Sequence, residues 1–186
     1  VFLHRSIADR FIYELVSRCN ALVTGDPEDP ATDVGPMINP DKAEEALQRI
    51  EEAVSQGARV LCGGRLSGHL LLPTILADTT PDMAVNCEEV FAPILTVTPY
   101  ESLEEAIAMV NDSRFGLQAG IFTKDLGLAI HASKTIQCGA VLINDIPTFR
   151  IDSMPYGGVK ESGIGREGPY YAIREMTEER LVIIRS

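Results

Sequence analysis

The greatest density of chemically versatile residues lies in Met154–Gly168, where five glycines accompany a lysine, a serine and an arginine. Glycine loses more conformational freedom on folding than any other residue, so this density predicts a backbone that turns sharply or approaches another group closely. These residue types also occur in phosphate-binding loops, but Gly163-Ile164-Gly165 lacks the full Gly-x-Gly-x-x-Gly spacing and no Gly-Lys-Ser/Thr order is present. We therefore expect a structural loop, in which Lys160 and Arg166 bind neighbouring carboxylates or carbonyls.

Thiols and imidazoles are the other side chains that could act as nucleophiles or metal ligands. The cysteines are far apart and form no Cys-x-x-Cys pair, so the sequence predicts neither a zinc ribbon nor a redox pair. The three histidines share no metal-ligand spacing, and we expect no metal. Reduced thiols are usual in the cytoplasm, which is the predicted location. The four cysteines are Cys19, Cys62, Cys87 and Cys138.

The composition describes a globular protein with an acidic surface. The 186 residues suffice for one substantial core, and a hydrophobic content of 45% is ordinary. The net charge of −11 argues against unaided binding to nucleic acid or to an anionic membrane surface. No run approaches the roughly 18 apolar residues of a membrane helix. We expect neither nucleic acid nor a membrane as a partner.

Apolar periodicity and chain breakers divide the first half into helices and strands. Val1–His4 is predicted to be a strand, and Ser6–Leu22 a helix with Ser6 as its cap. Asn39-Pro40 has the residues of a second helix start, and Gly57 is expected to end that helix. Further strands are predicted at Arg59–Leu61 and, with a break at Pro73, at Leu70–Leu76.

The second half reads as strand, helix, strand, helix and strand, which is the succession of a right-handed parallel α/β layer. The expected strands are Pro93–Tyr100, Gly120–Thr123 and Ala140–Asn144. Their apolar character predicts burial on both faces, so the fold class is α/β, a parallel open sheet with helices on both faces. Ligands bind beyond the carboxyl ends of such strands, which places Asn144–Gly168 at the expected functional edge.

Several blocks of the chain resemble the aldehyde dehydrogenase superfamily. Glu88-Glu89-Val90-Phe91-Ala92-Pro93 resembles its Glu-x-Phe-x-Pro motif, and Gly157–Gly168 resembles its closing glycine-rich block. The other blocks occur in the family's order, so the resemblance covers essentially the whole chain. They are Gly25-Asp26-Pro27 with Thr32–Pro36, Asn111-Asp112 with Phe115–Leu117, Gly120–Asp125, and Gly139–Asn144.

The resemblance implies an enzyme that oxidises a small aldehyde to a carboxylic acid with NAD or NADP. In the family a cysteine thiolate attacks the aldehyde and forms a thiohemiacetal, which becomes a thioester after hydride transfer. The nucleophile lies just before a strand that resembles Val1–His4, and the general-base glutamate and the cofactor domain lie further upstream. The chain begins on a strand without Met, so we expect a fragment without a catalytic residue of its own, inactive in isolation.

The resemblance also implies roles for residues of this chain. Glu89 and Phe91 match the positions that contact the nicotinamide ribose and orient the nicotinamide end of the cofactor. Without the resemblance, Glu89 reads as a helix-end cap and Phe91 as a core residue, while Glu88 is expected to be a solvated neighbour.

Asn144, Phe149 and Arg150 are the candidates for the substrate pocket. Asn144 ends a strand, where its amide can donate to substrate, hold the following loop or serve as a turn residue. The loop after it matches the family's substrate entrance, which Phe149 can line. Arg150 can pair with an acidic substrate group, or with Asp145 or Asp152, or remain solvated. The run Pro147–Arg150 resembles branches that act on small hydroxy-, phospho- or sulfo-aldehydes.

The carboxyl-terminal residues are predicted to have a separate role. We expect residues 1–176 to form a partial catalytic domain and residues 177–186 an oligomerisation strand. Arg180–Ile184 reads as a strand, and the family's corresponding strand joins a sheet across the subunit boundary in a homo-oligomer. An unpaired apolar strand would promote aggregation, and pairing with a partner avoids this.

Two alternatives remain open from the sequence. The chain could be a natural, non-catalytic truncated module used for assembly or binding, although its start on a strand without Met disfavours this. It could also derive from a reductase of related fold acting on acyl phosphates, which the Glu-x-Phe-x-Pro block opposes.

Overall fold

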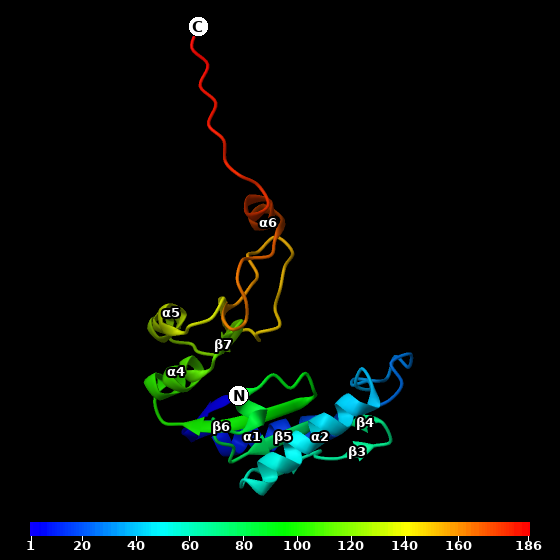
Figure 1. Cartoon of the computed structure of the whole chain (residues 1–186). Coiled ribbons are helices and arrows are strands. Elements are labelled where there is room, and N and C mark those ends of the chain that lie inside the picture. Colours follow the sequence, from blue (N-terminus) through cyan, green and yellow to red (C-terminus); the bar gives the residue numbers. More distant parts are fainter. The chain divides into compact units, whose positions relative to one another are not determined.

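The computed structural model describes all 186 residues, which fall into two compact units, Val1–Leu103 and Glu104–Ser186 (Figure 1). Each unit is described by itself. None of the helices is both long enough and apolar enough to cross a membrane.

A four-stranded sheet organises the first unit. Its strand order is β1-β6-β5-β2, in which β6 pairs in parallel with both β1 and β5 while β2 is antiparallel to β5. The strands are β1 (Phe2–His4), β2 (Arg59–Cys62), β5 (Thr74–Ala77) and β6 (Ile94–Tyr100). The short strands β3 (Leu66–Ser67) and β4 (Leu70–Leu71) form a separate antiparallel pair, so the predicted break near Pro73 is confirmed.

Helix α1 (Arg5–Ala21) begins one residue earlier than predicted. Its cap is His4, whose Nδ1 accepts a hydrogen bond from the Ser6 amide at 3.3 Å. The prediction that Ser6 is the cap is therefore wrong, because Ser6 already lies within the first turn. An imidazole acceptor at the end of a strand is not among the usual cap residues, which explains why the sequence pattern missed it.

Helix α2 (Pro40–Ser55) follows its predicted boundaries. Asn39 Oδ1 accepts a hydrogen bond from the Lys42 amide at 2.8 Å, and Pro40 occupies the first turn, where its missing amide hydrogen costs nothing. The helix ends before Gly57, which has a φ of +110°. Both predicted signals, the Asn-Pro start and the glycine end, are confirmed.

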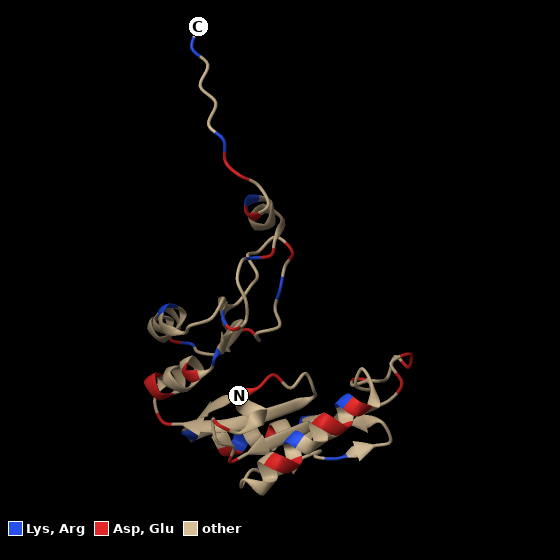
Figure 2. Ribbon diagram, viewed as in Figure 1, with Lys and Arg blue, Asp and Glu red and all other residues tan.

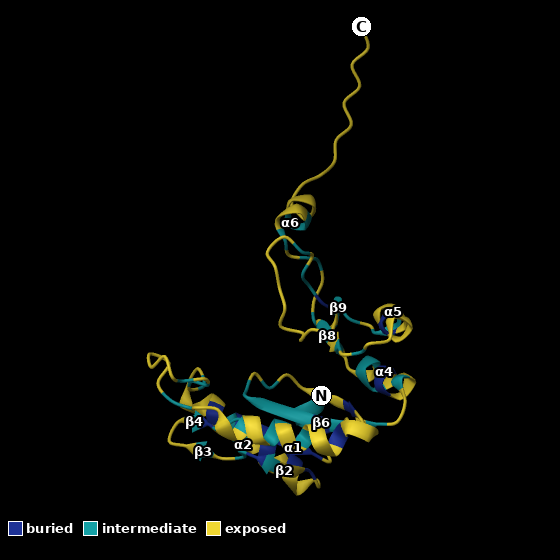
Figure 3. Cartoon of the chain, turned by 180° about the vertical axis from the view of Figure 1, so that it is seen from behind, coloured by how far each residue is buried: buried dark blue, intermediate teal, exposed yellow.

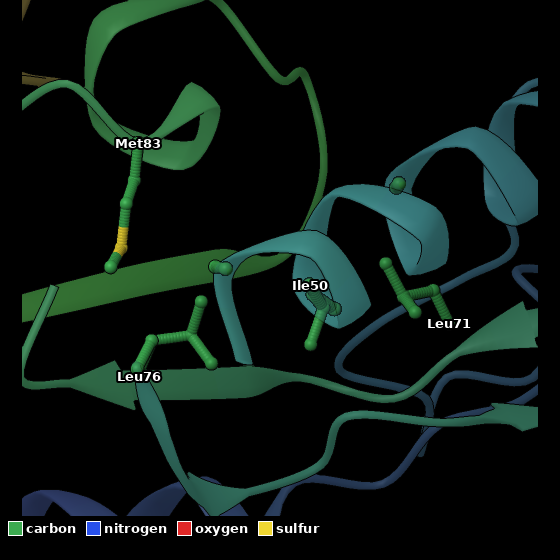
Figure 4. Packing of buried hydrophobic residues seen from close by; sticks show 7 residues of the cluster. Ile50, Leu71, Leu76 and Met83 are labelled. Carbon is green, nitrogen blue, oxygen red and sulfur yellow. The ribbon is translucent and has the colours of Figure 1, made fainter. Parts of the chain in front are cut away.

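The two helices cover opposite faces of the sheet, because consecutive side chains of β5 point in opposite directions. Leu76 packs in a cluster with Ile50 of α2, whereas Ile75 and Ala77 pack in a second cluster that contains Ala8 of α1. Figure 4 shows Ile50, Leu71, Leu76 and Met83 converging between α2, β5 and the start of α3 (Ala84–Cys87). This confirms the α/β class with helices on both faces.

The second unit contains two further strand pairs. Strands β8 (Gln118–Ile121) and β9 (Ala140–Ile143) are parallel and are joined through α5 (Leu126–Thr135), as the strand-helix-strand pattern predicted. Strand β6 does not join them, because both of its edges are taken by β1 and β5. The predicted single layer is therefore divided between two sheets. The remaining elements are α4 (Leu103–Asp112), β7 (Phe115–Gly116), β10 (Val159–Lys160) and α6 (Pro169–Glu175).

The glycine-rich segment contributes β10 to the second unit, where it pairs antiparallel with β7. Lys160 donates to the carbonyls of Asn111 and Ser113 at 2.7 and 2.8 Å, and Arg166 donates to the carbonyls of Gly158 and Gly165 at 2.9 and 2.6 Å. The predicted structural role, with the two cations tied to neighbouring carbonyls, is confirmed.

Residues 177–186 form neither helix nor strand in the single chain and are exposed throughout (Figure 3). Leu181 and Ile184 are 84% and 88% exposed. A strand is defined by backbone hydrogen bonds to a neighbouring strand, and this segment pairs with no strand of its own chain. The oligomerisation strand therefore stays a prediction.

Candidate functional site

A hollow of about 530 Å³ lies in the first unit, between α2 and the segment that follows α3. We call it the α2 hollow. Glu89 and Phe91, the two residues predicted to contact the cofactor, both line it. Its other lining residues are Pro36, Met37 and Ile38 from the preceding loop, Lys42, Glu45, Ala46 and Arg49 from α2, and Val90.

The backbone displays Phe91 rather than burying it. Phe91 has a φ of +46°, a left-handed conformation that costs a non-glycine residue roughly 1–3 kcal/mol. Its ring is nevertheless 83% exposed, so burial does not compensate for this cost. Strain of this kind is typical of binding and catalytic positions. Within this chain Phe91 is therefore not a core residue.

Glu89 is also exposed and does not cap a helix. The residue at the carboxyl end of α3 is Glu88, whose amide donates to the Ala84 carbonyl at 3.0 Å. The Glu89 carboxylate has no hydrogen-bond partner in the chain, so both of its oxygens are free to accept hydrogen bonds from a ligand.

Charged residues alternate in sign around the α2 hollow, as Figure 2 shows along α2. Arg49 pairs with the Glu88 carboxylate and, at 3.4 Å, with Glu45, while Lys42 contacts Glu45 at 2.5 Å. The Lys42 hydrogen bond is the main cause that lowers the pKa of Glu45. Glu88 is exposed to solvent, as predicted, and is in addition an ion-pair partner of Arg49. The approach of Arg49 from 39 positions earlier could not be read from the local sequence.

Sequence reasoning missed the contribution of α2 to this site. Lys42, Glu45 and Arg49 are spaced by three and four residues, and this spacing places side chains on one helix face. That spacing was a usable signal. It was masked by the stronger apolar periodicity of Ala43, Ala46 and Ile50 on the neighbouring, buried face.

Asn144, in the second unit, stabilises a turn. Its Oδ1 accepts a hydrogen bond from the Thr123 amide at 2.9 Å, and its own amide donates to the Ile121 carbonyl at 2.7 Å. Its φ of +59° lies in the left-handed region that asparagine tolerates better than most residues. The side-chain Nδ2 has no partner in the chain and can still donate to a ligand.

Arg150 and Phe149 lie on the loop after β9. Arg150 Nη2 contacts Glu167 Oε2 at 2.8 Å, and the guanidinium lies 4.5 Å from the centre of the Tyr156 ring. Glu167 is thus the partner, and the pairing considered with Asp145 or Asp152 is wrong. Phe149 is 46% exposed.

Three of the four thiols of the chain are poorly suited to act as nucleophiles. Burial, followed by the neighbouring Cys62, raises the pKa of Cys19 to about 12, and burial also raises the pKa of Cys138. Cys62 is only 8% exposed. Because the thiolate is the nucleophile, raised pKa values disfavour reaction near neutral pH.

Together these features define an α/β protein with a ligand-sized hollow beside an exposed carboxylate and an exposed aromatic ring. Residues 1–182 match the aldehyde dehydrogenase family. The chain belongs to this family. A 3-sulfolactaldehyde dehydrogenase of Priestia aryabhattai is 45% identical over 184 residues, which cover 99% of this chain and 39% of that protein. A lactaldehyde dehydrogenase of Methanococcus aeolicus is 39% identical over 186 residues, covering 100% of this chain and 40% of that protein.

Solved structures show the same fold. Aldehyde dehydrogenase 21 from Physcomitrella patens, in complex with the reaction product succinate, superposes with a TM-score of 0.96 at 36% identity, covering 99% of this chain and 38% of that one. Glyceraldehyde-3-phosphate dehydrogenase GapN from Methanocaldococcus jannaschii, complexed with NADP, gives 0.89 at 39% identity, covering 94% and 38%. An NAD+ complex of an aldehyde dehydrogenase from Bacillus cereus gives 0.91 at 35% identity, covering 96% and 37%. The chain thus spans about two fifths of the length of the relatives it matches.

Proposed function

We propose that this chain is the carboxyl-terminal part of the catalytic domain of an NAD(P)-dependent aldehyde dehydrogenase, which oxidises a small aldehyde to its carboxylic acid. The observation that carries the proposal is the exposure of Glu89 and Phe91 beside the α2 hollow in a member of this family. The NADP and NAD+ complexes among its structural neighbours support the choice of cofactor.

The residues around the α2 hollow fit the nicotinamide end of such a cofactor. The unpartnered Glu89 carboxylate can accept hydrogen bonds from both ribose hydroxyls. The exposed Phe91 ring offers an apolar face that limits movement of the nicotinamide. When bound, the cofactor accepts the hydride that leaves the substrate.

The cysteine nucleophile and the general base are proposed to lie outside this chain, because the family resemblance places them upstream, and because Cys19, Cys62 and Cys138 are buried or have raised pKa values. In the whole enzyme the thiolate would add to the aldehyde as a thiohemiacetal. Loss of hydride would leave a thioester, which water would hydrolyse to the acid and free thiol. The chain alone is therefore proposed to be inactive.

The loop after β9 is proposed to recognise an anionic group on the substrate. Arg150 provides a guanidinium, which suits carboxylate, phosphate or sulfonate oxygens, and a substrate anion would replace Glu167 as its partner. Phe149 and the free Nδ2 of Asn144 would complete this part of the pocket. The names of the relatives, which include a 3-sulfolactaldehyde dehydrogenase and a succinate complex, support a small anionic aldehyde.

A cytoplasmic homo-oligomer is the proposed assembly, with residues 177–186 pairing across the subunit boundary. The exposed apolar run Leu181–Ile184 supports this pairing. Light scattering of the whole protein with and without residues 177–186 measures the number of subunits in the assembly. An unchanged number of subunits after the deletion would contradict the proposal.

The cofactor role of Glu89 is tested in the whole protein that carries this segment. Replacing Glu89 with glutamine keeps its size and removes its charge, so the KM for the cofactor should rise by roughly tenfold, because a hydrogen bond to a charged group is worth about 1.5–3 kcal/mol. The KM for the aldehyde should change little. Unchanged steady-state kinetics of Glu89→Gln would refute the proposed site.

A further inference from the structure

Glu89 and Phe91 are the two exposed residues of the segment Glu88–Phe91, which we call the cofactor segment. The residue that precedes each of them, Glu88 or Val90, contacts another part of the first unit. The backbone at Glu88 is extended, with φ −119° and ψ 160°, and side chains alternate in direction along extended chain. Glu88 pairs with Arg49 of α2, and Val90 packs against the apolar cluster that contains Ile50. The segment is therefore anchored through alternate residues, by Glu88 on Arg49 of α2 and by Val90 on the apolar cluster, which leaves Glu89 and Phe91 exposed.

Arg49 differs from the other ion-pairing arginines of the first unit. Its side chain is only 21% exposed, whereas Arg59, which pairs with Asp78 at 3.0 Å, is 66% exposed. Charges that are partly withdrawn from water interact more strongly and are screened less by salt. The hydrogen bond to Glu88 is the main cause that raises the pKa of Arg49, and Glu45 of α2 raises it further, so Glu88 is the stronger of its two partners.

The strain at Phe91 increases the need for this anchor. A left-handed, non-glycine backbone persists only where its surroundings fix it, and Phe91 is 83% exposed, so its ring contributes little to that fixing. The surroundings that fix it are Val90 and the Arg49–Glu88 pair before it, and after it Ala92, which packs on the same apolar cluster, and the Pro93 carbonyl, which accepts from the Thr74 amide at 2.9 Å.

We propose that Arg49 is a positioning residue, which holds the Glu88–Phe91 segment on α2 so that Glu89 and Phe91 keep the orientation that the cofactor needs. The inference rests on the proposed function and adds a residue that contacts the segment through Glu88. Arg49 acts by restricting the segment before the cofactor binds, and this lowers the ordering cost of binding.

The test uses Arg49→Met in the whole protein, since methionine keeps the apolar stem and loses both ion pairs. The KM for the cofactor should rise about fivefold, in line with a partly buried ion pair, while the KM for the aldehyde stays within about twofold. Arg49→Lys should recover part of the loss. The matched control is Arg59→Met, which removes an exposed ion pair of the same unit and should change neither constant.

A double-mutant cycle separates positioning from general destabilisation. Glu88→Gln removes only the partner on the segment and should reproduce the effect of Arg49→Met, and the double variant should be no worse than either single variant. Additive effects would overturn the proposal, as would an equal rise of the KM for the aldehyde in Arg49→Met.

The outcome for Glu89→Gln distinguishes this inference from the proposed function. If Glu89→Gln raises the KM for the cofactor and both Arg49→Met and Glu88→Gln leave it unchanged, the positioning role is refuted and the cofactor site stands. If Glu89→Gln has no effect, the cofactor site itself is refuted. Because Glu88 is half exposed, Glu88→Gln gives a folded variant for the test even if Arg49→Met does not fold.

Discussion

At the scale of single residues, Phe91 combines a left-handed backbone with a ring that is 83% exposed. An aromatic side chain without a binding role has little reason to occupy such a position, because the strain is not offset by burial. Glu89, two positions earlier, has a carboxylate without an internal partner. These two properties support the proposed contact of this segment with the cofactor, and neither was visible in the residue types alone.

The strain at Phe91 predicts a conflict between stability and binding. Phe91→Gly should be more stable than Phe91→Ala by about 1 kcal/mol, because glycine adopts positive φ without a Cβ penalty. Both variants should bind the cofactor more weakly than the parent protein, because both lack the ring. Urea unfolding and cofactor titration of the two variants measure this, and equal stability would mean that the backbone is not strained.

Cys19 gives a prediction of pH dependence. Its pKa in the folded chain is raised to about 12, above the ordinary value, so folding favours its protonated form. The contribution of this thiol to the free energy of unfolding is fully present below the pKa of an unfolded cysteine, about 8.5. It is lost as the pH rises toward about 12. Iodoacetamide should therefore modify Cys19 far more slowly at about pH 9 in the folded chain than in urea, as peptide mass mapping can show. Equal rates in the two states would contradict the raised pKa.

At the scale of elements, α2 serves two purposes with two adjacent faces. Ala43, Ala46, Ile50 and Ala53 are buried against the sheet, while Lys42, Glu45 and Arg49 line the α2 hollow. Burial of Ile50 alone is worth roughly 1.5–3 kcal/mol, so the core fixes the helix and the helix fixes the charged face. One wall of the proposed cofactor site is thus a helix fixed by the core, while Glu89 and Phe91 lie on the irregular segment opposite it.

Gly139 packs so closely against Gly157 of the glycine-rich block that we predict no room for a Cβ at position 139. A Cβ on Gly139 would lie 1.7 Å from the Gly157 carbonyl oxygen, so Gly139→Ala must displace backbone and should cost about 3 kcal/mol or more. Gly35→Ala is the control, because its Cβ would meet only Pro27 at an ordinary 3.6 Å. Thermal unfolding compares the two. Similar melting temperatures for both variants would refute the close packing of this block.

Local signals in the sequence predicted most elements, and long-range contacts account for the failures. The Asn39-Pro40 start, the Gly57 end and the parallel β8–α5–β9 unit depend on neighbouring residues and were predicted. The pairing of Arg49 with Glu88 and of Arg150 with Glu167 depends on distant segments meeting, and the sequence pattern assigned those charges to solvent or to nearby partners. The cap at His4 was missed because imidazole is an uncommon cap.

At the scale of the whole molecule, this chain covers about two fifths of the length of its relatives. Its exposed apolar residues are consistent with the proposal that it acts within a larger enzyme. Phe11 and Tyr13 of α1 are 42% and 77% exposed, and Leu181–Ile184 has no partner in the chain. In the proposed enzyme these apolar groups would contact other parts of the same subunit or a second subunit. In this proposal the Glu88–Phe91 segment would contribute to cofactor binding, and the thiolate chemistry would come from elsewhere.

Aldehyde-dependent reduction of NAD+ or NADP+ tests the central claim most directly, measured in parallel for the whole protein and for residues 1–186. Small aldehydes that carry a carboxylate or a sulfonate are the substrates to supply. We predict that the whole protein forms NADH or NADPH only when an aldehyde is present, and that residues 1–186 form none. Turnover by residues 1–186 alone, or a folded whole protein that oxidises none of these aldehydes, would contradict the account.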